Sequence, residues 1–350
     1  MKNFNPGLLF LALACLFSSC EQDITVETIV HEDGSLDRTI TFEDVDSAIA
    51  VKNMFGISQA TGWAVAMEEW DRTESEDTWT VQFNKKFASV EASNSEMATN
   101  TDTTFVLRSE VEEKFRWFYT YMKYSDTYGA LNRFDGLNPG DYFTAEDYAF
   151  IDRLPAEGKT IPKADSLYLR KLNEKIFDHY ASRAIYDENY AVLANVMREN
   201  DIEDRWIDTL ASHKESLYRY FFRNQDDLVD EDFMLLFADS LQIPMPYPKG
   251  RDDFERLGSD LEKRLIFMSD ANSGKFSQAI QMPWPVINTN ADSVAGTRVF
   301  WSPPLIKFML KDYTMYAESR RINYWAVLVS GVLVLLTVVL LAGRAFRRDS

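Results

Sequence analysis

An uninterrupted apolar stretch near the C-terminus constrains this chain more than any other feature. Residues 324–343 read YWAVLVSGVLVLLTVVLLAG and contain no charged side chain. A helix of this length extends about 30 Å, which is the thickness of the hydrocarbon core of a bilayer. Valine and leucine occur on every face of this helix, whereas a helix packed on a globular core shows one apolar stripe. We therefore predict a transmembrane helix over residues 324–343.

The N-terminus has the composition of a secretory signal. A positive charge precedes an apolar run of 10 residues, 8–17, which is too short to span a bilayer. Two serines then precede Cys20, and this order resembles the lipobox of bacterial lipoproteins. We predict a lipoprotein signal peptide at 1–19 and acylation of Cys20, which becomes the new N-terminus.

An ordinary signal peptide that contains a cysteine by chance is the alternative. The chain has two cysteines, Cys15 and Cys20, and cleavage before Cys20 removes the first. The mature chain then keeps one thiol and forms no internal disulfide. A lone thiol is a liability in an oxidising compartment, whereas a lipidated cysteine is not, so the cysteine usage favours acylation.

The two ends together predict the orientation of the chain. The tail 344–350 carries three arginines, as is typical of the cytoplasmic side of a membrane. Arg320 and Arg321 precede the helix and weaken this asymmetry, but an exported N-terminus requires the same orientation. We expect a single-pass inner-membrane protein with its main part in the periplasm. A lipid beside the spanning helix would hold the N-terminal strand next to the C-terminal one, close to the bilayer.

The segment between the two anchors is acidic. Residues 20–323 contain 33 basic and 54 acidic side chains, a net charge of −21. A field of this sign repels nucleic acid, which we exclude as a partner. The length of this segment suits one large domain or two ordinary ones.

Strand patterns and helix patterns alternate along this segment. Residues 20–128 predict three hairpins, the first turning at Asp33-Gly34 and the others pairing 63–72 with 78–87 and 103–108 with 114–124. Short helices are expected at 46–55 and 89–98. A loop-rich linker follows at 129–163, with Thr144 as a helix N-cap.

Apolar residues at helical spacing then dominate residues 164–268, for example Trp206, Leu210 and Leu217. Residues 275–321 return to strand patterns and lead into the membrane. We therefore predict an α+β fold, in which an antiparallel sheet with covering helices is interrupted by a helical-bundle insertion. Antiparallel pairing of the N-terminal and C-terminal strands would close this sheet.

The order of these features resembles the LppM-type lipoproteins. The resemblance is carried by Cys20, the strand 24–30, Asp33-Gly34, Asn290-Ala291 with Val299 and Trp301, and the helix with its basic tail at 324–348. It covers residues 20–128 and 275–350, whereas 164–268 departs from the family's smaller domain. The resemblance implies an envelope protein that binds lipid or glycolipid.

Catalytic signatures are absent from the sequence, so we predict no catalytic residue, no metal and no cofactor. The chain has no HExxH, no GxSxG and no complete P-loop. His31, His179 and His213 lie far apart in the sequence, and His213 falls on an apolar stripe that predicts a core position. The acidic residues at 226–232 suit a solvated helix end, with a calcium site as the alternative.

The segment 115–124, FRWFYTYMKY, is the most pointed candidate for a binding site. In a single strand, four aromatic residues share one face, namely Phe115, Trp117, Tyr119 and Tyr121. Apolar residues also occupy the other face, which favours a buried central strand. The alternative is that the four form the wall of a groove for lipid or glycan.

These features predict a membrane-anchored envelope protein that is a binding or scaffold protein rather than an enzyme. Its expected partners are the membrane, a lipid or glycolipid, and an inner-membrane protein. Two alternatives remain open: a hydrolase that uses carboxylates of the segment 164–268, and an assembly subunit of an inner-membrane complex.

Overall fold

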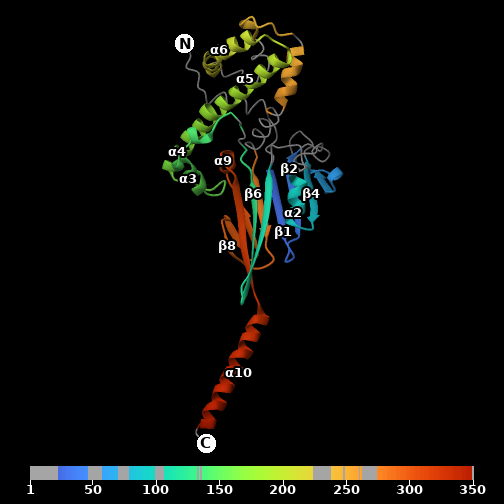
Figure 1. The fold of residues 1–350 in the computed structure, drawn as a ribbon, viewed down its shortest axis with the longest axis vertical. Helices are drawn as coiled ribbons and strands as arrows, with labels where there is room; N and C mark the ends of the chain where they lie inside the picture. The colour runs from blue at the N-terminus through green and yellow to red at the C-terminus, as the bar shows by residue number, and fades with distance from the viewer. Residues whose placement is uncertain are drawn as a thin grey trace. The chain divides into compact units, whose positions relative to one another are not determined.

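The chain folds into two compact units, one mainly helical and one that contains all the described strands (Figure 1). The computed structural model describes residues 23–45, 57–69, 79–98, 106–131, 134, 136–223, 238–246, 249–259, 261 and 274–348. Unit 1 takes its described residues from 130–275 and 304–311, and unit 2 comprises 23–129, 276–303 and 312–350. The α+β fold is confirmed, and the mainly helical unit 1 interrupts the chain of unit 2.

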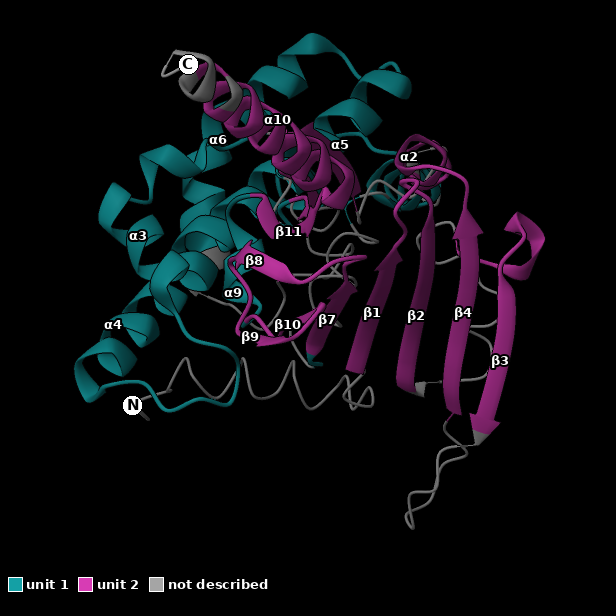
Figure 2. Cartoon of the chain, turned by 90° about the horizontal axis from the view of Figure 1, so that it is seen from below, with its two compact units in different colours: residues 1–22, 130–275, 304–311 teal, residues 23–129, 276–303, 312–350 magenta. Residues whose placement is uncertain are grey.

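Unit 2 contains two β-sheets. The larger has seven strands in the order β3-β4-β2-β1-β7-β10-β9 (Figure 2), and the smaller has four in the order β5-β6-β11-β8. The strands are β1 (Asp23–Val30), β2 (Leu36–Val45), β3 (Ala64–Glu69), β4 (Trp79–Phe87), β5 (Leu107–Phe115), β6 (Tyr119–Tyr128), β7 (Phe276–Gln281), β8 (Val286–Thr289), β9 (Ser293–Ala295), β10 (Arg298–Trp301) and β11 (Tyr313–Ile322). Unit 2 also holds η2 (Gln59–Thr61), α2 (Val90–Ala98) and α10 (Tyr324–Arg348).

Several local predictions for unit 2 are confirmed. The first hairpin turns at Asp33-Gly34, where Gly34 has φ +80° and Val30 pairs with Leu36. The second hairpin is β3 with β4, and α2 follows it as expected. The helix predicted at 46–55 lies outside the described residues.

The predicted antiparallel pairing of the N-terminal and C-terminal strands is wrong. β1 pairs in parallel with β7, with Ile24 opposite Phe276, whereas β11 belongs to the other sheet. Arg321, near the end of β11, donates to Glu32, just after β1, at 2.6 Å. The two strands therefore run toward the same end of unit 2, and β1 begins at the end away from α10. An alternating apolar pattern gives the buried face of a strand but not its direction.

A buried ion pair joins the two sheets of unit 2. Arg38 of β2 donates to Asp126 of β6 at 3.0 Å, and both side chains are fully buried. Gln278 of β7 and the Tyr124 hydroxyl donate to the same carboxylate, each at 2.7 Å. Burial alone would lower the pKa of the Arg38 guanidinium, but the charge of Asp126 outweighs it and raises that pKa. Arg38 therefore stays charged.

We expect Asp126→Asn to destabilise the protein by about 3–5 kcal/mol, because it leaves the Arg38 charge buried without a counter-ion. Urea unfolding of the full chain in detergent micelles, followed by circular dichroism, measures this loss. Glu112→Gln is the matched control, since the Glu112–Lys114 pair at 2.8 Å is exposed and contributes little. A loss equal to that of the control would show that the buried pair does not hold the sheets together.

Unit 1 is mainly helical. Its elements include η3 (Pro139–Asp141), α3 (Ala145–Arg153), α4 (Lys163–Glu174), the π-helical turn η4 (Lys175–Ala181), α5 (Ser182–Glu199), α6 (Asp204–Arg223) and α9 (Ile306–Met309). Leu210 and Leu217 of α6 are buried against α5, as their spacing predicts. The prediction for His213 is wrong, because the residue is exposed. The buried face passes instead through Lys214, which pairs with Asp187 at 2.8 Å.

Asp147 connects three elements of unit 1. Thr144 is the N-cap of α3, as predicted, and Asp147 completes a capping box with it. The same carboxylate accepts from Tyr168 of α4 and Lys175 of η4, both at 2.8 Å. Burial alone would raise the pKa of Asp147, but these donors outweigh it and lower the pKa to about 2. The charged form is therefore bound more tightly in the folded state.

Because this pKa falls from 3.8 to about 2 on folding, Asp147 adds stability that is present above pH 3.8 and is lost as pH falls toward 2. The expected contribution near neutral pH is about 2 kcal/mol. Thermal unfolding of wild type and Asp147→Asn as a function of pH should show a gap at pH 7 that narrows below pH 4. Asp152→Asn, in an exposed pair with Lys311, serves as the control. A gap independent of pH would contradict this assignment.

Candidate membrane-interface site

The segment 115–124 is a hairpin rather than one strand. β5 ends at Phe115, β6 begins at Tyr119, and the backbones of Arg116 and Tyr119 exchange two hydrogen bonds of 2.7 and 3.2 Å. The prediction of a buried central strand is wrong for this turn, since Phe115, Trp117 and Phe118 are 58%, 46% and 45% exposed. Tyr119 and Tyr121 are half-buried on one face of β6.

The aromatic side chains of this turn contact the start of α10. The ring of Phe115 stacks on Trp325 with centroids 6.3 Å apart, and Trp117 meets Trp325 edge to face at 5.3 Å. The Trp117 indole also donates to the Ser330 hydroxyl at 2.8 Å. Two of the four predicted residues therefore join a cluster of three aromatic rings at the helix.

The other two predicted residues lie farther along β6. The rings of Tyr119 and Tyr121 are 6.3 Å apart, and the guanidinium of Arg320 lies over Tyr119 at 4.8 Å. Arg320 belongs to β11, which pairs with β6 along its whole length, from Tyr313 opposite Tyr128 to Ile322 opposite Tyr119. The four residues thus belong to one hairpin, but Phe115 and Trp117 lie at its turn, whereas Tyr119 and Tyr121 lie along β6.

Asn323 is the single residue between β11 and α10, and it fastens the turn to the helix. Its amide nitrogen Nδ2 donates to the carbonyls of Arg116 (2.9 Å) and Trp117 (3.3 Å). Its Oδ1 accepts from the Thr120 hydroxyl at 2.9 Å, and its backbone N–H donates to the Phe118 carbonyl at 2.9 Å. Asn323 is buried, and its backbone carbonyl accepts from the N–H groups of Ala326 (2.9 Å) and Val327 (3.2 Å), so the residue bonds to both the hairpin and the helix.

The helix α10 has the surface of a membrane helix. In the part of the chain that the structure describes, the stretch Tyr324–Ala342 is the one helix long and apolar enough to cross a membrane. Leu328, Leu335 and Leu340 are each at least 65% exposed, unlike the side chains of a core helix. Ala326 is fully buried, and it shares a face with Asn323 and Ser330 by helical spacing. This face of small residues accommodates the hairpin.

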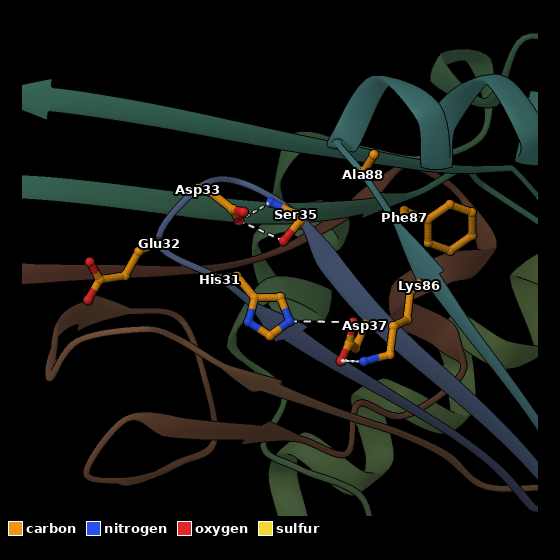
Figure 3. A pocket seen from close by; sticks show the side chains of 8 residues that line it. All are labelled: His31, Glu32, Asp33, Ser35, Asp37, Lys86, Phe87 and Ala88. Atoms are coloured by element: carbon orange, nitrogen blue, oxygen red, sulfur yellow. Dashed lines mark hydrogen bonds and ion pairs between the residues drawn. The ribbon is translucent and has the colours of Figure 1, made fainter.

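A second candidate is a cavity of about 600 Å³ beside the β1–β2 turn (Figure 3). His31 lies 3.4 Å from Asp37, which also pairs with Lys86 at 3.3 Å. The Ser35 hydroxyl donates to Asp33 rather than to His31, so this arrangement closes a turn and does not activate a nucleophile. The cavity therefore contains an exposed polar network without the geometry of a hydrolase.

The remaining predicted sites are not part of the hairpin or of the cavity. Cys20 and the acidic segment 226–232 lie outside the described residues. Among the residues that are described, no group of three or more histidine, cysteine or acidic side chains is placed to hold a metal ion.

Comparison with known proteins adds one similar structure. No protein-family model matches the chain, and no curated protein matches it. The NMR structure of the folded domain of LppM from Mycobacterium tuberculosis aligns over 92% of this chain and 96% of that chain, with 7% identity and a TM-score of 0.30. A TM-score at this level supports no inference, so the site is interpreted from its own geometry.

We expect Asn323→Ala to release the hairpin from the helix at a cost of about 2 kcal/mol, because three side-chain hydrogen bonds are lost. Hydrogen exchange of the full chain in micelles should show faster exchange at residues 116–120. Asn288→Ala is the control, since Asn288 is exposed and its side chain makes one long bond of 3.5 Å to Glu318. Unchanged exchange at the turn would show that Asn323 does not hold it.

Proposed function

We propose that this protein is a non-enzymatic scaffold or binding protein of the bacterial envelope, anchored in the inner membrane by α10. Unit 1 and the two sheets of unit 2 lie in the periplasm in this proposal, and the tail 344–350 is cytoplasmic. The observation that carries the proposal is the junction at Asn323. Strand β11 ends at Ile322 and α10 begins at Tyr324, so unit 2 is mounted on the helix without a flexible linker.

The linker-free junction between β11 and α10 indicates a role beyond retention of the protein at the membrane. A flexible tether keeps a domain at the surface equally well, but it leaves the distance and orientation of the domain undefined. The hydrogen bonds of Asn323 and the contacts of Trp117 fix the distance and the orientation of the sheets of unit 2 relative to α10. A fixed height and orientation suit a surface that is presented to a partner in the same membrane, either a protein or an amphiphile.

The exposed edge strand β9 offers a place to detect such a partner. Its three residues are exposed, Val294 to 52%, and strand edges are common docking sites. A photoreactive amino acid at Val294, activated in intact cells, should give a reproducible adduct with a membrane protein or lipid. A Gly-Ser-Gly-Ser insertion after Ile322 should leave the protein in the membrane fraction but remove the adduct, because the mount is broken.

The same insertion after Arg348 is the matched control, since it leaves the junction intact. An adduct that survives both insertions would show that the mount does not position the partner. Failure of the wild-type chain to form an adduct would count against the scaffold proposal itself. Release of the wild-type chain by alkaline extraction would contradict the anchoring by α10.

A further inference from the structure

The tip of the β5–β6 hairpin presents apolar surface beside the start of a membrane helix. Phe115, Trp117 and Phe118 are each about half exposed, and Trp325 beside them is 53% exposed. Tyr324 and Ile322, which adjoin the same junction, are 74% and 44% exposed. A continuous exposed patch of this kind on a folded unit usually marks an interaction surface.

The contact between Trp117 and Ser330 gives the depth of this tip. Ser330 lies six residues beyond Tyr324, which corresponds to about 9 Å along the helix axis. The indole N–H reaches that level at 2.8 Å from the Ser330 hydroxyl. A bilayer that surrounds the apolar stretch Tyr324–Ala342 must therefore also surround the tip of the hairpin.

The backbone carbonyls of the turn already have hydrogen-bond partners within the protein. The carbonyl of Arg116 accepts from Tyr119 N–H and Asn323 Nδ2, and that of Trp117 accepts from Asn323 Nδ2. The Phe118 carbonyl accepts from the backbone of Asn323. An unpaired carbonyl costs several kcal/mol in hydrocarbon, so this bonding is what lets irregular backbone enter a membrane.

The charges around the tip match a lipid headgroup layer. Arg116 lies in the turn and is exposed, and Lys114 before it pairs with Glu112 at 2.8 Å. Arg320 and Arg321 lie on β11, which pairs with β6. Arg321 is fixed by its pair with Glu32 at 2.6 Å. Basic side chains just outside an aromatic layer are placed to meet lipid phosphates.

We propose that the β5–β6 tip is a membrane-inserting element, which buries Phe115, Trp117 and Phe118 in the interface of the same bilayer that α10 spans. The partner of this surface is the lipid itself. The inference rests on the anchoring proposed above, and it adds that the β5–β6 turn of unit 2 also enters the membrane. The serine and the threonine of Tyr324–Ala342 fit this setting, since Ser330 is paired with Trp117 and Thr337 with the Leu333 carbonyl.

Photocrosslinking to lipid tests the proposal in the full chain. The probe is p-benzoylphenylalanine at Phe118, in vesicles of phosphatidylethanolamine and phosphatidylglycerol. Irradiation followed by mass spectrometry should give phospholipid adducts at this position. The matched control places the probe at Glu110, an exposed position earlier on β5, where adducts should be several-fold fewer. A third chain carries the probe at Leu335, in the middle of the apolar stretch.

The three positions separate the two proposals. Lipid adducts at Leu335 and Phe118 but few at Glu110 are the expected result. Adducts at Leu335, with Phe118 no higher than Glu110, would overturn insertion of the hairpin while leaving the anchoring intact. No lipid adduct at Leu335 would overturn the anchoring. Adducts from Phe118 to a second protein chain instead of lipid would also refute the proposal.

Discussion

A single asparagine joins the two environments of this protein. Asn323 ends a strand that lies in a folded sheet and begins a helix whose side chains are suited to lipid. Four of its hydrogen bonds go to one hairpin and two go to the first turn of the helix, so the strand, the hairpin and the helix form one body. Without them, the carbonyls of Trp117 and Phe118 would lose the partners described above. The aromatic contacts and the depth of the turn all depend on this residue.

The rigidity of this junction extends into unit 2 through β6. One end of β6 starts at the turn held by Asn323, and the other end carries Asp126, which pairs with Arg38 of the opposite sheet. Strand β6 is therefore held at its two ends by different polar interactions, one at the start of α10 and one between the sheets. The ten residues of β6 therefore couple the orientation of α10 to the orientation of the seven-stranded sheet.

Local sequence signals predicted local structure well. The Asp33-Gly34 turn, the Thr144 cap and the apolar C-terminal helix follow from backbone chemistry and spacing. The sequence does not indicate the turn inside 115–124, because Arg116, Trp117 and Phe118 include no glycine, proline or asparagine and two of the three are aromatic residues typical of strands. Its aromatic content was noticed, but the ring that completes the cluster, Trp325, is 208 positions away from Trp117 in the chain.

Long-range pairings could not be predicted from one sequence. Nothing near Asn323 indicates that its amide will reach a turn more than 200 residues earlier. Asp126 did leave a trace, since a carboxylate inside an apolar strand requires a buried partner, but Arg38 is one of many arginines. The parallel pairing of β1 with β7 also leaves no local mark, because the separation between them includes the entire helical unit.

The direction of β1 has a consequence for the reach of the N-terminus. Cys20 precedes Asp23 by three residues, which extend at most about 10 Å. The ten residues of β11, which runs the same way as β1, separate the two ends of the sheets by about 30 Å. With the hairpin tip dipped in the bilayer of α10, an acyl chain on Cys20 falls short of that bilayer. Lipidation of Cys20 would therefore not hold the start of β1 at the surface of that bilayer.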